Sequence, residues 1–290
     1  MDQNKVDKRG IIYIVIATLG FSIIPILAQI GLATNLGAST LLFYRFFLAF
    51  VVFFLYVIIA KKKVKLEEKS DYIHVFLAGL IYSLQCIFFF SSFKYISSSL
   101  GEIIYQCYPF FVLILAYFFL NEKITKGKLI GVALSIMGTI ITIYGPLGNN
   151  HIRGIIYVII TAFISSVYII FSKQRVSNID TTVLTMYLCL VCSIVYLLYS
   201  LVRKDFVIIT DLHLVFNVTV LAICSTVIGF FAFMKAISLL SAGYVSILSL
   251  LEPIFTIVLA YLILGVALTP LQLLGTTIVL IGVYIYERGN

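Results

Sequence analysis

Ten apolar segments, each about as long as a bilayer crossing, make up most of this chain and constrain its fold more than any other feature. Apolar positions run continuously within each segment, which excludes the alternating pattern of a membrane barrel. Because backbone groups in the bilayer core have no water to pair with, each segment is predicted to be a helix. The ten helices are expected near residues 10–32, 39–60, 72–93, 97–120, 127–145, 152–172, 181–202, 214–237, 241–264 and 270–287.

The composition excludes most other classes of protein. Hydrophobic residues make up 62% of the 290 positions and charged residues 11%, whereas roughly a quarter of the residues of a soluble domain are charged. A soluble enzyme, a secreted disulfide scaffold and a disordered regulator are therefore excluded. All five cysteines lie inside apolar runs, and the CxxC pair Cys189 and Cys192 is interpreted as small apolar filler. We predict an all-α polytopic membrane protein.

The net charge of +8 is distributed as a topology signal. With the N-terminus in the cytoplasm, the inner segments hold fifteen of the Lys and Arg residues, and the outer segments hold four, Lys94, Arg153, Arg203 and Lys204. Short cytoplasmic loops normally carry such an excess of basic residues. We therefore predict a multi-pass protein of the cell (inner) membrane with both termini in the cytoplasm, surrounded by the lipid bilayer and without a nucleic-acid partner.

The chain contains an internal repeat at an offset of 144 residues. Arg9–Ile16 (RGIIYIVI) aligns with Arg153–Ile160 (RGIIYVII), and the later parts of the two halves align without gaps. Two domains are predicted, 1–144 and 145–290, each a repeat of five helices. The matches that chance explains least well are Pro109 with Pro253, Gly131 with Gly275 and Gly138 with Gly282.

An odd number of helices in each repeat makes the second copy enter the membrane from the opposite side. Inverted repeats of this kind are typical of secondary transporters, whose substrate site lies between the repeats near the membrane midplane. Two nearly equivalent halves can also exchange roles, so the inward-open and outward-open states are close in energy. The architecture therefore predicts alternating access.

Motifs in both halves resemble a known family. The second predicted helix carries LLFYRFFLAF with Arg45, and the two repeats carry YP…AYFFLNEKIT…G and EP…AYLILG…LT…G at corresponding ends. Over nearly its whole length the chain resembles the drug/metabolite transporter superfamily, specifically its EamA-type ten-helix members. The resemblance implies a ten-helix bundle with a central cavity and the export or exchange of small metabolites, often amino acids. The chain has Gln29 where the family often has a lysine, and Val266 where its second repeat usually has a glutamate; Glu122 fills the matching slot of the first repeat.

An ionisable residue inside a span is costly, so it is expected to face a cavity or a partner. Glu252 lies roughly 16 Å into its predicted helix at 1.5 Å per residue, and Pro253 follows it. A proline removes one helical hydrogen bond, and transporters use such breaks to present backbone and charge to a solute. Glu252 is therefore a candidate for substrate or proton contact, with Pro109 and Pro253 as hinges. A purely structural ion pair or hinge is the alternative.

A second polar stripe lies in the first repeat. Helical i, i+3, i+4, i+7 spacing would place its members on one face, and these are Glu102, Tyr105, Gln106 and Pro109. The matching positions of the second repeat include two small polar residues, Ser246 and Ser249. Both stripes are expected to face the pseudo-symmetry axis, where they would line the substrate site.

The remaining candidates are charged, aromatic and amide side chains of other predicted helices. Arg45 lies at the same predicted depth as Glu102, and two interpretations stay open: the two side chains pair and stabilise the outer half, or they bind the solute. Aromatic rings can hold an amine by cation–π contact or serve as ordinary packing, and the candidates are Tyr82, Tyr105, Tyr108 and Tyr244. Gln29 and Gln85 are candidate hydrogen-bonding groups.

A secondary transporter that exports or exchanges a small polar metabolite, such as an amino acid or an amine, accounts best for these features. An intramembrane enzyme would need a convergent catalytic cluster, but His74, His151 and His213 lie at span edges or in loops. A membrane channel or scaffold is the other alternative, although no ring of charges or filter-like loop is evident. The prediction is therefore a non-enzymatic transporter without cofactor or metal, coupled to a proton or counter-substrate, as a monomer or a homodimer.

Overall fold

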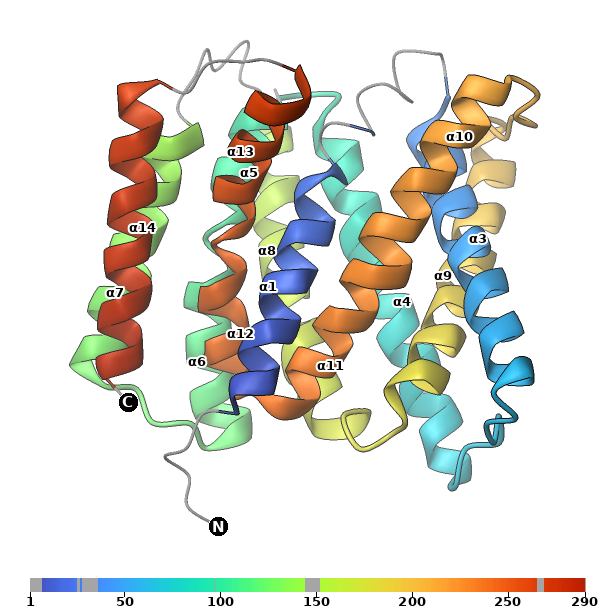
Figure 1. Cartoon of the computed structure of the whole chain (residues 1–290), viewed down its shortest axis with the longest axis horizontal. Helices are drawn as coiled ribbons and strands as arrows, with labels where there is room; N and C mark the ends of the chain where they lie inside the picture. Colours follow the sequence, from blue (N-terminus) through green and yellow to red (C-terminus); the bar gives the residue numbers. More distant parts are fainter. Residues whose placement is uncertain are drawn as a thin grey trace.

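The computed structural model describes residues 7–24, 27, 36–96, 98–143, 152–264 and 269–289. Within these residues the protein is all-helical, with 83% helix and no strand. The helices run roughly parallel or antiparallel to one another between the two ends of the molecule, and α1 begins at the same end at which α14 ends (Figure 1). The elements of the first half are α1 (Lys8–Ser22), α3 (Ala38–Ile59), α4 (Lys69–Ser92), α5 (Ser98–Tyr105), α6 (Tyr108–Leu120) and α7 (Lys126–Ile143). Those of the second half are α8 (Ile152–Arg175), α9 (Thr181–Arg203), α10 (Leu212–Leu221), the π-helix η1 (Ala222–Phe230), α11 (Phe231–Leu239), α12 (Ala242–Ser249), α13 (Glu252–Leu264) and α14 (Pro270–Arg288).

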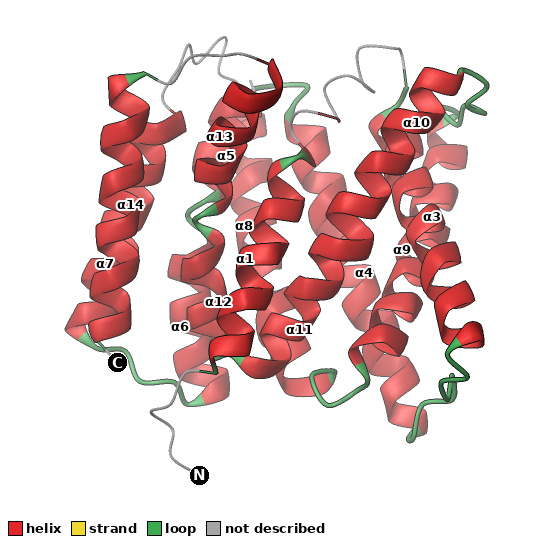
Figure 2. Cartoon of the chain, in the orientation of Figure 1, coloured by secondary structure: helices red, strands yellow, loops and turns green. Residues whose placement is uncertain are grey.

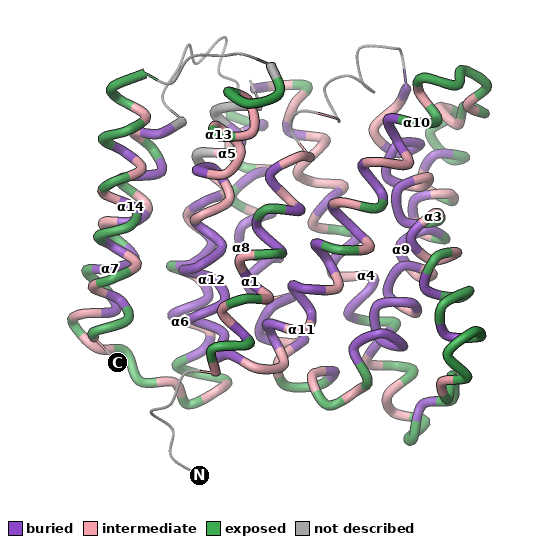
Figure 3. Tube along the Cα trace, viewed as in Figure 1, coloured by how far each residue is buried: buried purple, intermediate pink, exposed green. Residues whose placement is uncertain are grey.

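The protein spans a membrane several times. Seven helical stretches of the described residues are long and apolar enough to cross a bilayer. Large apolar side chains also cover the outside of the bundle, including Ile59, Val202 and Phe216, which are 79%, 82% and 71% exposed. Figure 3 shows exposed positions along the outer faces of the helices and buried positions toward the interior. A surface of this kind is stable in lipid and unfavourable in water.

Two of the predicted spans, 97–120 and 241–264, are each interrupted, the first as α5 and α6 and the second as α12 and α13. The breaks lie at residues 106–107 and 250–251, which are related by the same offset of 144 as the sequence repeat. Figure 2 shows these interruptions about midway between the two ends of the bundle. Each half-helix that follows a break has a proline at its second position, Pro109 in α6 and Pro253 in α13. A proline there has no N–H with which to continue the preceding helix.

The predicted span 214–237 corresponds to one helical run, Leu212–Leu239, with a π-helical middle. Here α1 approaches η1 very closely, because a Cβ atom added to Gly20 would lie 2.6 Å from the carbonyl oxygen of Cys224 and 2.8 Å from the Cα atom of Gly229. π-Helical segments inside longer helices are often found at functional sites. This one carries the polar residues Ser225 and Thr226 into the interior, where both are fully buried.

Helices α7 and α14 form an antiparallel pair at one edge of the bundle (Figure 1). An added Cβ atom on Gly131 would lie 2.7 Å from the carbonyl oxygen of Gly282, and one on Gly138 would lie 2.7 Å from that of Gly275. Small residues allow helix backbones in membranes to approach this closely. The four glycines are two pairs from the sequence repeat, so the repeat itself supplies the close contact between these two helices.

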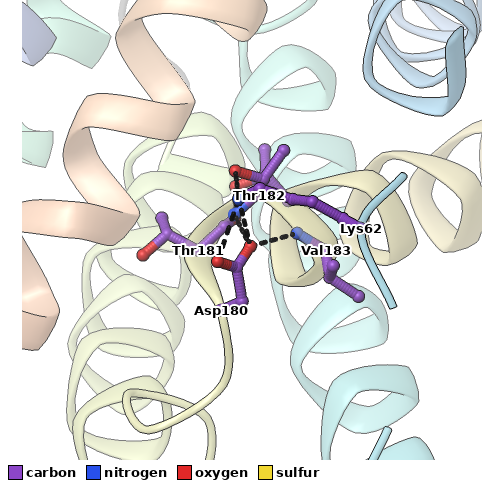
Figure 4. A network of polar contacts seen from close by, with 6 residues as sticks. Lys62, Asp180, Thr181, Thr182 and Val183 are labelled. Atoms are coloured by element: carbon purple, nitrogen blue, oxygen red, sulfur yellow. Dashed lines mark hydrogen bonds and ion pairs between the residues drawn. The ribbon is translucent and has the colours of Figure 1, made fainter. Parts of the chain in front are cut away.

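A polar network fixes the start of α9 (Figure 4). The carboxylate of Asp180 accepts hydrogen bonds from the backbone N–H groups of Thr182 (3.0 Å) and Val183 (3.2 Å), which caps the helix. Lys62 Nζ lies 3.0 Å from the same carboxylate and also donates to the hydroxyl of Thr182. The network therefore ties the connector between α3 and α4 to the beginning of α9.

Asp180→Asn is expected to destabilise the protein slightly at neutral pH, and by less as the pH falls below about 3.9. Burial raises the pKa of Asp180, but hydrogen bonds from Lys62, Val183 and Thr182 outweigh it and hold the pKa below its ordinary value. A lowered folded-state pKa stabilises the fold above the unfolded value of about 3.9, and this contribution is lost as the pH falls through the folded value. Because Asp180 is 53% exposed, the effect should stay below about 1 kcal/mol.

The measurement is thermal unfolding of both proteins in detergent at neutral pH and at about pH 3. Asp180→Ala serves as the comparison, because it also removes the cap and should cost about 1 kcal/mol more. A difference between wild type and Asp180→Asn that persists unchanged at the low pH would contradict the electrostatic explanation.

Candidate functional site

The two helix breaks lie beside each other inside the bundle. The N-terminal end of α6 packs against α12, and the hydroxyl of Tyr108 donates a hydrogen bond to the carbonyl oxygen of Ser246 (3.3 Å). The carbonyl oxygen of Tyr108 accepts a hydrogen bond from Ser166 of α8 (3.0 Å). Both α6 and α13 begin at a break, so the positive ends of two helix dipoles lie within the bundle.

Arg45 of α3 is buried, with 4% of its surface exposed. Its Nε atom donates to the hydroxyl of Thr226 in η1 (2.7 Å), and its guanidinium lies 5.2 Å from the centre of the Phe46 ring. A buried arginine requires partners for its remaining donors, but Nη2 has none among the described residues. The arrangement leaves one strong donor of a buried cation available for another group.

Arg45 does not form the ion pair with Glu102 that was one of its two predicted roles. The described residues contain two ion pairs, Lys62 with Asp180 and Arg203 with Asp205. Arg45 instead interacts electrostatically with Glu252, the first residue of α13. Predicted depth in the membrane indicated Glu102 as the partner of Arg45. It did not indicate Glu252, which belongs to the other repeat.

The two carboxylates of the candidate site interact with each other across the breaks. Glu102 accepts a hydrogen bond from the side-chain nitrogen of Gln106 (3.0 Å). Glu252 lies at the start of α13, and its carbonyl oxygen accepts from the hydroxyl of Thr256 (3.0 Å). These two half-buried carboxylates and the buried Arg45 give the site both signs of charge.

The tyrosines of the first repeat form a polar aromatic surface. Tyr105 and Tyr108 are stacked with their ring centres 5.1 Å apart. The hydroxyl of Tyr105 accepts hydrogen bonds from Gln85 and Ser165, both at 3.4 Å. Gln85 and Tyr105, two separate candidates from the sequence, are therefore in contact, and Ser165 of α8 joins them.

The predicted stripe is only partly preserved. Pro109 lies on α6, beyond the break, so it does not share a continuous helix face with Glu102 and Tyr105 as predicted. Ser246 and Ser249 are buried, but their hydroxyls donate to carbonyl oxygens of their own helix, those of Gly243 (2.9 Å) and Val245 (2.8 Å). Their hydroxyl protons are therefore already satisfied within α12.

Other predicted residues have different surroundings. Tyr82 packs in an aromatic cluster with Phe46, Tyr168 and Phe230, and Tyr244 packs edge-on against Tyr286, which agrees with the packing interpretation of both. Gln29 lies outside the described residues. Sequence reasoning missed Thr226, although a Ser-Thr pair inside an apolar span was an available signal.

Three buried side-chain atoms around the breaks have no hydrogen-bond partner in the described part of the chain: Arg45 Nη2, Gln85 Oε1 and Gln106 Oε1. Unpaired polar atoms cost free energy when buried. One is a cationic donor and two are acceptors, and all come from residues that the sequence marked as candidates. Together with Glu102 and Glu252 they can bind a small solute that carries both donor and acceptor groups.

Comparisons with known proteins identify the family and the relatives of the chain. The EamA-like transporter family matches the chain twice, over residues 8–144 and 152–287. An uncharacterized transporter of Archaeoglobus fulgidus is 27% identical over 237 residues, covering 81% of this chain and 83% of the relative. A probable amino-acid metabolite efflux pump of Salmonella typhimurium is 27% identical over 80% of each chain. An S-adenosylmethionine uptake transporter of Rickettsia conorii is 25% identical over 90% of this chain and 86% of its own. One crystal structure, 16% identical, has the same fold, with a TM-score of 0.81 over 95% of both chains.

Proposed function

The chain belongs to the EamA-like transporter family, and on that premise we propose that it is a secondary active transporter of a small polar metabolite, such as an amino acid or an amine. Transport follows alternating access, as export or exchange. Relatives named as an amino-acid metabolite efflux pump and as an S-adenosylmethionine uptake transporter support a polar organic substrate. A proton or a counter-substrate drives the cycle.

The proposed architecture is ten transmembrane helices in two inverted repeats, residues 1–144 and 145–290. Three observations support it: the family matches each half, the two helix breaks share the 144-residue offset, and α7 packs antiparallel to α14 through glycines of both repeats. Both termini are proposed to be cytoplasmic, because the end of the bundle that contains them carries most of the basic residues.

One observation carries the substrate proposal: the polar atoms of Arg45, Gln85 and Gln106 that are buried beside the breaks without partners among the described residues. The free donor of Arg45 suits a carboxylate, since arginine binds carboxylates strongly. Glu102, Glu252 and the stacked rings of Tyr105 and Tyr108 suit an ammonium group. A zwitterionic solute would satisfy both sets, with the two helix N-termini adding positive potential.

The test is counterflow of labelled amino acids into proteoliposomes that contain the purified protein and an excess of unlabelled amino acid. Accumulation of one labelled amino acid, and none in protein-free liposomes, is the expected result. If amines move and amino acids do not, the substrate class narrows to amines. If no solute shows counterflow while a small ion passes, the protein is a channel and the proposal fails.

Glu122 gives the transport cycle an inner gate. Its carboxylate accepts hydrogen bonds from the backbone N–H groups of Ala242 (2.8 Å) and Gly243 (3.4 Å), so it caps α12 from the loop that follows α6. In the repeat, Glu122 matches Val266 and Ala242 matches Ser98, the first residue of α5. A valine side chain cannot accept a hydrogen bond. The first repeat thus supplies an acceptor that caps α12 at the end of the bundle that contains the termini. The matching position of the second repeat, Val266, supplies no such acceptor for α5.

Glu122→Gln is expected to open this gate more often. Hydrogen bonds to a charged group contribute about 1.5–3 kcal/mol, so amide exchange at the start of α12 should rise roughly 10-fold or more. Hydrogen–deuterium exchange of peptides that cover residues 240–246 measures this. Glu67→Gln, an exposed change in the connector between α3 and α4, is the control and should leave the exchange unchanged. Equal exchange in Glu122→Gln and wild type would remove Glu122 from the gate.

A further inference from the structure

A polar pocket separate from the helix breaks lies at the end of the bundle opposite the start of α1 and the end of α14 (Figure 1). It has a volume of about 220 Å³ and lies between the C-terminal ends of α4 and α9 and the beginning of α8. Its polar lining consists of two cations, three tyrosines and a serine: Lys94, Arg203, Tyr95, Tyr157, Tyr199 and Ser91. None of these residues belongs to the candidate transport site.

The pocket carries uncompensated positive charge. Arg203 is paired with Asp205 (3.1 Å) and also donates to the hydroxyl of Tyr199 (3.4 Å). The ammonium group of Lys94 has no hydrogen bond or ion pair within the described ranges. This end of the bundle has only four basic residues in the whole sequence, and two of them line one pocket. Such a pocket attracts an anion.

The pocket continues into an apolar surface that faces lipid. Phe88 of α4 is part of the lining. Leu84 lies four residues before Phe88, and Leu77 lies seven residues before Leu84, so the three side chains share one helix face. Leu84 is 46% exposed and Leu77 is 40% exposed. A soluble anion would gain nothing from this strip, whereas the acyl chain of a lipid would cover it. Tyrosines at the mouth are typical of the level at which lipid headgroups lie.

We propose that this pocket binds the phosphate headgroup of an anionic phospholipid in the leaflet opposite the termini, with an acyl chain along Phe88, Leu84 and Leu77. The free ammonium of Lys94 and the guanidinium of Arg203 contact the phosphate oxygens, and the hydroxyls of Tyr157 and Tyr199 donate to the same group. The bound lipid joins α4, α8 and α9 at an end where α8 and α9 have few direct contacts with each other. The site is independent of the transported solute.

The experiment titrates fluorescent phosphatidylglycerol into the purified full-length protein in detergent. Lys94→Gln is the main variant, because the Lys94 side chain has no partner whose loss would unfold the described structure. Near a membrane surface each basic residue contributes about 1 kcal/mol, so affinity should fall about 5-fold. Lys204→Gln is the matched control, since Lys204 adjoins Arg203 but does not line the pocket, and it should leave the affinity unchanged.

Two competitors identify the ligand. Unlabelled phosphatidylglycerol should displace the probe, whereas phosphatidylcholine should be at least 5-fold weaker if the pocket selects net negative charge. Glycerol 3-phosphate should not compete, because it has no acyl chain. The proposal is overturned if Lys94→Gln binds like wild type, if Lys204→Gln weakens binding equally, if phosphatidylcholine competes equally, or if glycerol 3-phosphate competes as well as the lipid.

Discussion

Glu252→Gln is expected to reduce amino-acid counterflow 10- to 100-fold while the protein stays folded. Glu252 begins α13 at the second helix break and interacts electrostatically with both Arg45 and Glu102. Glutamine keeps the shape of the side chain and removes its charge, so a substrate ammonium would lose a charged partner. Hydrogen bonds to charged groups contribute about 1.5–3 kcal/mol, which corresponds to roughly 10- to 100-fold in affinity.

Arg45 supplies the complementary variant. Arg45→Lys keeps the positive charge but cannot reproduce a planar guanidinium that donates from Nε to Thr226 while presenting Nη2. We expect transport to fall by a similar factor, with a change in apparent affinity for the carboxylate-bearing substrate. Thr226→Val, which removes only the acceptor that orients Arg45, should have a smaller effect of the same kind.

Folding must be separated from transport in these measurements, because a buried charge left unpaired destabilises a protein by about 3–5 kcal/mol. Size-exclusion profiles and thermal unfolding of each variant provide this control. Normal counterflow by a folded Glu252→Gln protein would show that the carboxylate is structural. Normal counterflow by Arg45→Lys as well would place the substrate elsewhere in the protein.

Gly138→Leu is expected to have the largest effect on stability. A Cβ atom at this position would lie 2.6 Å from the backbone nitrogen of Val279 and 2.7 Å from the carbonyl oxygen of Gly275. Backbone cannot move aside as a flexible side chain can, so α7 and α14 would have to separate. Overpacking of a buried site costs about 1–3 kcal/mol or more, and the pair has little other contact with the bundle.

The matched control is Ala133→Leu, which enlarges an exposed position of the same helix. Both purified variants are compared with wild type by thermal unfolding and by the yield of monodisperse protein in detergent. A lowered midpoint for Gly138→Leu, with Ala133→Leu unchanged, is the expected outcome. Equal stability of all three proteins would show that the α7–α14 contact is looser than the described structure has it.

The sequence was a good guide to elements whose physics is local. Continuous hydropathy predicted helices whose observed bounds mostly agree within a few residues, such as 39–60 for Ala38–Ile59 and 181–202 for Thr181–Arg203. Paired prolines and glycines at one offset predicted where special backbone geometry would occur. Hydropathy alone did not locate the breaks within 97–120 and 241–264, because it records how a segment is solvated and not whether its hydrogen-bond ladder is unbroken; the paired prolines marked them.

Site residues were predictable by type but not by partner. Burial of a charge in an apolar run is visible in the sequence, so Arg45, Glu102 and Glu252 were found. Which of them interact is decided by how α3 packs against η1 and α13, since Arg45 of α3 lies 181 residues before Thr226 of η1 and still farther before α13. The same holds for Glu122 and the start of α12, and for Ser165 beside Tyr105.

The sequence by itself determined that this protein is a helical membrane protein of duplicated sequence, because the cost of exposing backbone and charge to lipid allows few alternatives. The tertiary structure alone decided that the two helix breaks adjoin, that Arg45 is oriented by Thr226 and interacts with Glu252, and that Lys94 and Arg203 line one pocket. These are contacts between segments distant in sequence, and they depend on close packing of side chains, which hydropathy and spacing do not record.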